Sequence, residues 1–136
     1  MISFSTCWNS NRHTEGRSVI NEIRGMGFDS IEVSHGLQVS LLPGIQEALH
    51  DGTINISGVH NFCPSPVEVL IDAPDCYEFT SHRSYDRKRA LDLTLTTLEN
   101  ASSLGAKYAV IHMGSVPMSR MTPRLEKLQK HGLGDS

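Results

Sequence analysis

Short apolar runs alternate with longer amphipathic stretches along the whole chain. The runs at 2–6, 31–33, 54–59 and 108–111 have the length and the β-branched or aromatic content of strands. Each is followed by a stretch in which apolar residues recur every three to four positions, as on one face of a helix. This strand–helix order, repeated four times, predicts an α/β fold with a parallel sheet and right-handed crossovers.

The helices are expected to end at glycines, because Gly27 and Gly105 stand where a left-handed C-cap is needed. In the longest helix Ser84 is expected as the N-cap. The expected helices cover about residues 17–26, 41–50, 84–104 and 122–131, and the buried face of the long one is expected to consist of Leu91, Leu95, Leu98 and Ala101.

The run at 108–111 is continuously apolar, which predicts a strand covered on both faces. In parallel sheets the chemistry lies just beyond the carboxyl ends of the strands. His60 and His112 each stand at such an end, so we expect them to lie together. Glu32 alternates with its apolar neighbours and should face the opposite side, where a buried carboxylate needs a basic or imidazole partner.

The length of 136 residues fits one domain, taken here as 1–136, with residues 63–83 as a long loop and candidate lid. Four strand–helix units make half of a (β/α)8 TIM barrel, which typically needs about 250 residues. A small open four-stranded sheet is the alternative. The last five residues read as a loop that leads onward, which favours a truncated half barrel.

A net charge of −3 gives no reason to expect a nucleic acid or an anionic membrane as partner. The sequence has no signal-peptide pattern and no run of transmembrane length. Three cysteines without metal-binding spacing favour a reducing, cytoplasmic location. Walker, GxGxxG, GxSxG and HExxH motifs are absent from the sequence, which excludes the enzyme classes that they mark.

Five short motifs together resemble the xylose isomerase-like TIM barrels, the sugar phosphate isomerases and epimerases to which endonuclease IV is related. The resemblance covers nearly the whole chain but only the N-terminal half of that barrel. The motifs are GFDSIE at 27–32, GVHNF at 58–62, SxDxxR at 84–89, LGA at 104–106 and VIHMG at 110–114.

The resemblance implies a divalent metal (Mn²⁺, Mg²⁺ or Zn²⁺), whose main ligands in the isomerases come from later strands than those of this chain. It implies that His60 and His112 contact substrate, or bind zinc if the chain is endonuclease IV-like. We expect His60, His112 and Glu32 as catalytic residues, and Trp8, Asn61 and Phe62 as residues that contact a small sugar or sugar phosphate. The leading prediction is an isomerase or epimerase.

Two other functions are weighed: a non-catalytic half barrel that pairs with a copy of itself or with a complementary half, and a zinc-dependent abasic-site nuclease. A zinc site made of Cys7, His60, Cys63 and His112 is a chemical alternative, although small buried thiols explain the cysteines better. The bland interpretation of His35, and of Asp86 and Arg89, is that they are solvated loop or first-turn residues.

Overall fold

A computed structural model of the chain describes residues 2–69, 73, 75–115 and 121–132. Its four strands form one sheet in the order β1-β2-β3-β4, and all neighbouring strands are parallel. The predicted α/β fold with a parallel sheet is therefore confirmed. The strands are β1 (Phe4–Ser5), β2 (Ser30–Val33), β3 (Asn55–His60) and β4 (Ala109–Val110).

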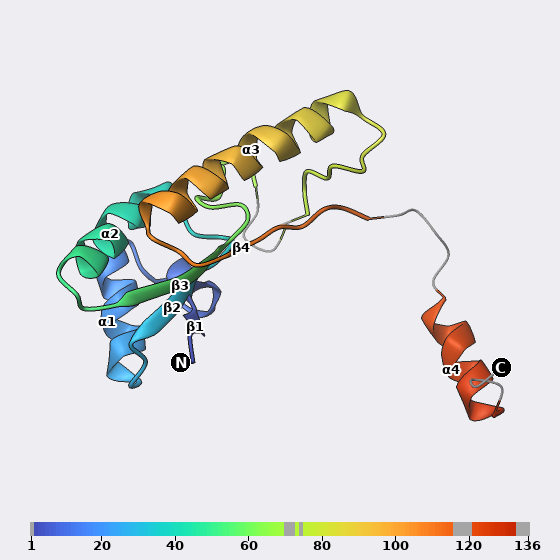
Figure 1. Cartoon of the computed structure of the whole chain (residues 1–136), viewed down its shortest axis with the longest axis horizontal. Helices are drawn as coiled ribbons and strands as arrows, with labels where there is room; N and C mark the ends of the chain where they lie inside the picture. Colours follow the sequence, from blue (N-terminus) through green and yellow to red (C-terminus); the bar gives the residue numbers. More distant parts are fainter. Residues whose placement is uncertain (1, 70–72, 74, 116–120, 133–136) are drawn as a thin grey trace.

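Helices follow each strand, as the pattern predicts. Figure 1 shows α1, α2 and α3 along one side of the sheet, and α4 apart from it. The helices are α1 (Gly16–Gly25), α2 (Leu42–His50), α3 (Ser84–Ser103) and α4 (Thr122–Lys130), and short 3-10 turns are η1 (Thr6–Trp8), η2 (Ser10–Arg12) and η3 (Val39–Leu41).

The two faces of the sheet differ in chemistry. Ile31 pairs with Phe4 on one side and Ile56 on the other, and this apolar row packs in the core beneath the helices. Glu32 pairs with Gly58, because the extra residue Ser57 in β3 shifts the register at this point. By alternation, Glu32 and His60 therefore belong to the face opposite the core.

The helices α1 and α2 are tightly packed against the sheet and against each other. A Cβ atom at Gly16 would lie 1.9 Å from the carbonyl oxygen of Leu41, and one at Gly44 would lie 2.5 Å from the backbone nitrogen of Arg17. Glycine is required at both positions, since the two backbones meet there. The buried residues of this pair include Val19, Ile20, Ile23, Leu42, Ile45 and Ala48.

The predicted buried face of α3 is wrong. Leu91 and Leu95 are each 49% exposed and Leu98 is 41% exposed. The buried face lies one position earlier in the sequence than the predicted leucines. Its residues are Asp86, Ala90, Thr94, Thr97 and Ala101. Of the predicted face, Ala101 alone is buried.

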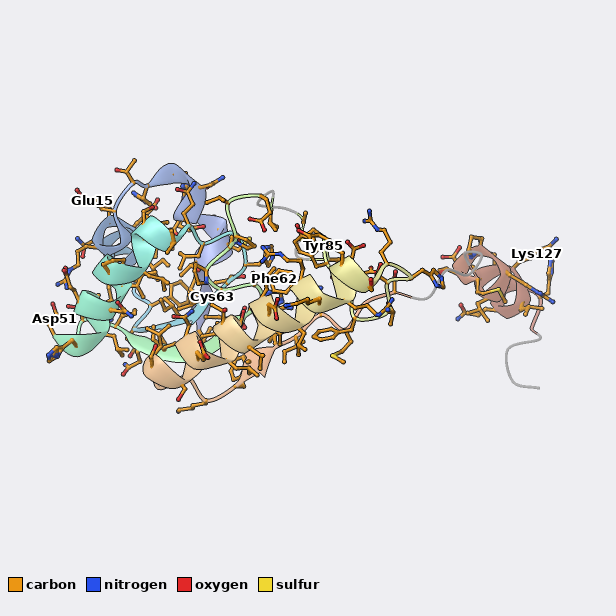
Figure 2. All side chains as sticks on the ribbon, turned by 90° about the horizontal axis from the view of Figure 1, so that it is seen from above. Glu15, Asp51, Phe62, Cys63, Tyr85 and Lys127 are labelled. Carbon is orange, nitrogen blue, oxygen red and sulfur yellow. The ribbon has the colours of Figure 1, made fainter. Side chains whose placement is uncertain are left out.

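Hydrogen bonding explains this orientation of α3. The hydroxyl of Thr97 accepts from the backbone N–H of Cys63 at 3.0 Å, and the amide of Asn100 donates to the carbonyl oxygen of Cys63 at 3.1 Å. Figure 2 shows Phe62 and Cys63 beside α3. Small and hydroxylated residues bring the helix close to this segment, which a row of leucines would hold away.

Two local predictions also need correction. The helix α3 begins at Ser84 itself, with Arg83 at the cap position and no side-chain hydrogen bond from that cap. The carboxylate of Asp86 in the first turn accepts from the side chains of Ser81 and Arg83. The strand β4 is half-buried rather than covered on both faces, since the helices cover one face of the sheet. The glycines predicted to end α1 and α3 have the expected left-handed conformation, with φ of 92° at Gly27 and 62° at Gly105.

None of the residues of α4, all of which the structure describes, is buried. Within the described part of the chain, no helix combines the length and the apolar character that crossing a membrane requires. Residues 70–72 and 74 of the predicted lid, and the last four residues of the chain, lie outside the described residues.

Candidate functional site

The two predicted histidines lie together at the carboxyl edge of the sheet. His60 ends β3, and His112 stands two residues beyond β4. Their Nε2 atoms are 3.1 Å apart, and their rings are nearly perpendicular, at 81°. The predicted juxtaposition is confirmed, while the role of the pair stays a prediction.

A carboxylate stands behind this pair. The Nδ1 atom of His112 contacts Oδ1 of Asp75 in the long loop. If Nδ1 of His112 carries the proton toward Asp75, then Nε2 of His112 accepts from Nε2–H of His60. The contacts thus form a row from Asp75 through His112 to His60.

The surroundings of His60 favour its neutral form. Burial lowers the pKa of His60 below its ordinary value, the nearby His35 and His112 lower it further, and the Glu32 carboxylate partly opposes this. The Nδ1 atom of His60 is buried and has no hydrogen-bond partner among the described residues. A protonated ring would have a second N–H to satisfy there, so a neutral imidazole fits the site better.

Asn61 joins the ends of β3 and β4. Its side-chain oxygen accepts from the backbone N–H of His112 at 3.1 Å, and its own N–H donates to the carbonyl oxygen of Val110 at 3.0 Å. The residue is fully buried, and its Nδ2 atom has no hydrogen-bond partner among the described residues. Asn61, predicted as a substrate contact, therefore holds His112 in place.

Glu32 has a partner, but not the basic or imidazole group that was expected. The hydroxyl of Tyr108 donates to Oε2 of Glu32 at 3.1 Å. The Tyr108 ring crosses β3 at Gly58, where a Cβ atom would lie 2.2 Å from a ring carbon. Two features of the sequence could have indicated this contact. Gly58 lies inside β3, and Tyr108 alternates onto the same strand face as His112.

His35 is not the solvated loop residue that the sequence suggested. It is half-buried, its ring centroid lies 5.0 Å from that of His60, and its Nε2 atom lies 3.8 Å from Sγ of Cys7. The position of His35 two residues beyond β2 was the signal, because carboxyl ends of parallel strands meet at one edge.

The two predicted aromatic contacts differ in their exposure, because Trp8 is 45% exposed and Phe62 is buried. Trp8 packs edge-on against Phe4, at 5.3 Å between centroids, with the guanidinium of Arg12 over its ring. Phe62 is 2% exposed and belongs to the interior near α3, as Figure 2 shows. Phe62 therefore does not form an open wall at the mouth of the site.

The helix-opening residues Asp86 and Arg89 are not solvated. Asp86 is buried, and its carboxylate accepts from Ser81 and from Arg83 at 2.9 and 2.8 Å. Arg89 pairs with Glu68 of the long loop and lies over the ring of Tyr77. Both residues attach this loop to α3, which is a structural role.

The alternative zinc site of Cys7, His60, Cys63 and His112 is not assembled. Cys63 is fully buried, and burial raises the pKa of its thiol to about 12, which disfavours the thiolate that binds zinc. Among the described residues, no three side chains of His, Cys, Asp or Glu are grouped so that they could hold a metal ion.

Comparison with known proteins adds no relative to this picture. No protein-family model matches the chain, and a search of curated proteins gives no match to it either.

Proposed function

We propose that this chain carries the N-terminal half of the site of a sugar or sugar-phosphate isomerase or epimerase, built on half of a xylose isomerase-like (β/α)8 barrel. The observation that carries the proposal is the contact of His60 and His112, at 3.1 Å between their Nε2 atoms, with Asp75 behind it. Carboxylate-oriented imidazoles are common acid–base groups near neutral pH.

The sheet topology supports the half-barrel part of the proposal. Its strands follow one another in sequence order, and α1 to α3 lie along one side of it. A doubly wound sheet would instead reverse its strand order and carry helices on both faces. In a barrel the face opposite the helices points inward, and here that face bears Glu32, Tyr108 and the histidine pair.

The chemistry assigned to this pair is proton transfer beside a carbonyl group. One imidazole removes the proton from the carbon next to the carbonyl, and the other gives a proton to the carbonyl oxygen, which yields an enediol. Return of the proton to the neighbouring carbon gives the isomer, and return to the other face of the same carbon gives the epimer. Glu32 and Tyr108, which hydrogen-bond each other on the same face, would hydrogen-bond substrate hydroxyls.

The resemblance, rather than the histidine pair, implies a divalent metal, whose main ligands in the isomerases come from later strands than those of this chain. In the isomerase proposal His60 and His112 stay free for proton transfer through the nitrogens that contact each other. In the nuclease alternative the same two histidines would instead hold zinc. When bound, the metal would polarise the carbonyl and hydroxyl oxygens of the sugar.

Nuclear magnetic resonance of the imidazole protons tests this proposal without requiring turnover, because half a site is expected to lack isomerase activity alone. We expect D-ribose 5-phosphate, with and without Zn²⁺, to shift the signals of His60 and His112. His50, exposed at the end of α2, is the control and should not shift. Equal shifts at His50, or no shift at the pair at millimolar ligand, would contradict the proposal.

A second candidate, a half barrel that pairs with another copy or with a complementary half, is favoured by the exposed leucines of α3. Leu91, Leu95 and Leu98 form an apolar stripe beside the buried face of that helix. Sedimentation across a concentration series should show self-association that the triple change of these leucines to glutamine weakens. A monomer at all concentrations would exclude self-pairing.

The nuclease alternative and the cytoplasmic location stay predictions. A zinc ion retained in one-to-one ratio after gel filtration would favour the nuclease, because the related endonuclease binds zinc through the matching histidines. Loss of all zinc under the same conditions would favour the isomerase or the non-catalytic half barrel.

A further inference from the structure

Reactive side chains line the carboxyl edge of the sheet, with one at the end of each strand. Cys7 follows β1, His35 follows β2, His60 ends β3 and His112 follows β4. The Cys7 sulfur lies 3.8 Å from Nε2 of His35, and the rings of His35 and His60 are 5.0 Å apart. The proposed function uses His60 and His112, and leaves Cys7 and His35 without a role.

The backbone on both sides of His35 is fixed by hydrogen bonds to neighbouring segments. The N–H of Ser34 donates to the hydroxyl of Thr6 at 2.9 Å, in a buried contact that ties β2 to the residue before Cys7. The N–H of Gly36 donates to the hydroxyl of Ser65 at 2.8 Å. The thiol and the imidazole are therefore held side by side by the fold.

The three cysteines of the chain differ in their surroundings. Cys63 is buried, which raises the pKa of its thiol to about 12. Cys76 is exposed, but partial burial raises the pKa of its thiol, and the Glu68 and Asp75 carboxylates add to this. Cys7 is exposed beside an imidazole, which can take the proton of a thiol and leave the nucleophilic thiolate.

We infer that Cys7 and His35 form a thiol–imidazole pair that adds reversibly to the carbonyl carbon of an open-chain aldehyde. The sulfur electron pair forms the S–C bond, the π electrons of the C=O bond move to oxygen, and the thiol proton passes through His35 to that oxygen. The product is a hemithioacetal. The choice of an aldehyde rests on the proposed function, whereas the reactivity of Cys7 does not.

Iodoacetamide labelling of the full chain at pH 7.5, mapped by mass spectrometry, tests the pair. A thiol with an ordinary pKa of about 8.5 is about one-tenth thiolate at this pH, so full deprotonation raises the rate about tenfold. We expect Cys7 to react at least about tenfold faster than Cys76, whose raised pKa leaves less thiolate still, and we expect Cys63 to stay unlabelled. His35→Asn should lower the rate of Cys7 about tenfold, with the melting temperature and the protection of Cys63 unchanged.

His35→Gln is the second variant if His35→Asn fails to fold. Equal rates at Cys7 and Cys76 in the unaltered chain, or an unchanged rate at Cys7 in a folded His35 variant, would overturn the pair. Glyceraldehyde should slow the labelling of Cys7 but not that of Cys76, and labelling without this protection would overturn the carbonyl step. Selective labelling of Cys7 combined with unshifted His60 and His112 signals would contradict the proposed function and leave the pair standing.

Discussion

The helices over the two halves of this sheet pack differently. In the half that contains β1 and β2, the apolar stripes of α1 and α2 are buried, and the two helices touch at glycines. In the half that contains β4, α3 turns small and hydroxylated residues inward, and its leucines remain exposed. A leucine stripe in the sequence thus does not by itself identify the buried face of a helix.

The largest expected effect compares the stability lost on truncating a side chain in each half of the sheet's helical layer. Ile20→Ala in α1 removes a fully buried side chain and should lower the free energy of unfolding by about 2–5 kcal/mol. Leu95→Ala in α3 removes a half-exposed side chain and should change it by no more than about 0.5 kcal/mol. Urea denaturation measures both. Equal losses would mean that the leucine stripe is covered in solution.

The same reasoning revises the expectation for Leu98. Placed in a buried stripe, Leu98→Ala would cost about 2–5 kcal/mol, but at 41% exposure the loss of stability should be small.

Three features of the molecule followed from periodicity and from the positions of strand ends. They are the fold class, the order of strands and helices along the chain, and the contact of His60 with His112. The orientation of α3 did not, because hydrogen bonds between Thr97, Asn100 and Cys63 decide it, and these join positions distant in sequence.

The partners of the site were hidden from the sequence for a related reason. Alternation placed Glu32 on the open face, but its contact with Tyr108 spans 76 positions and depends on the glycine at 58. Asp75 reaches His112 from an irregular loop, where no periodicity predicts a side-chain direction. Strand ends are thus more predictable than the loop residues that complete them.

A smaller loss of stability is expected when the close contact between α1 and α2 at Gly44 is disturbed. In Gly44→Ala the new Cβ would meet the backbone of Arg17 at 2.5 Å, so α2 must move from α1 at a cost of about 1–3 kcal/mol. Gly25→Ala is the matched control, because nothing lies within 4 Å of its Cβ position. That variant should be more stable by about 0.5–1 kcal/mol. Thermal unfolding of both shows whether the close approach exists.

The histidine pair at the carboxyl edge of the sheet should make the stability of the chain depend on pH. The pKa of His60 is lowered in the folded chain, mainly by burial, so the unfolded chain binds a proton more readily. The contribution of His60 to stability is therefore complete above the ordinary pKa of about 6.5 and is lost as pH falls below it. Urea midpoints at pH 7.5 and 5.5, with EDTA present, should differ less in His60→Gln than in the unaltered chain.

The smallest expected effect concerns a contact between the start of α1 and the end of α2. The pKa of Asp51 is lowered to about 2, first by the hydroxyl of Thr53, then by Arg17 and by the backbone N–H of Thr53. Thr53→Val removes the hydroxyl and keeps the other two donors. The pKa of Asp51 should then rise part of the way to its ordinary value of 3.8, as measured by carboxyl chemical shifts.

Within α3, the ion pair of Lys88 and Asp92 joins two exposed residues one turn apart and ties no second element to the helix. Lys88→Met is therefore the matched control, and it should leave the Asp51 titration where it is. The sign of the Thr53→Val effect follows from the lowered pKa: the stabilisation is present above pH 3.8 and is lost as pH falls toward 2. An Asp51 carboxyl that titrates near 3.8 in the unaltered chain would show that α1 and α2 meet at their glycines without this polar contact.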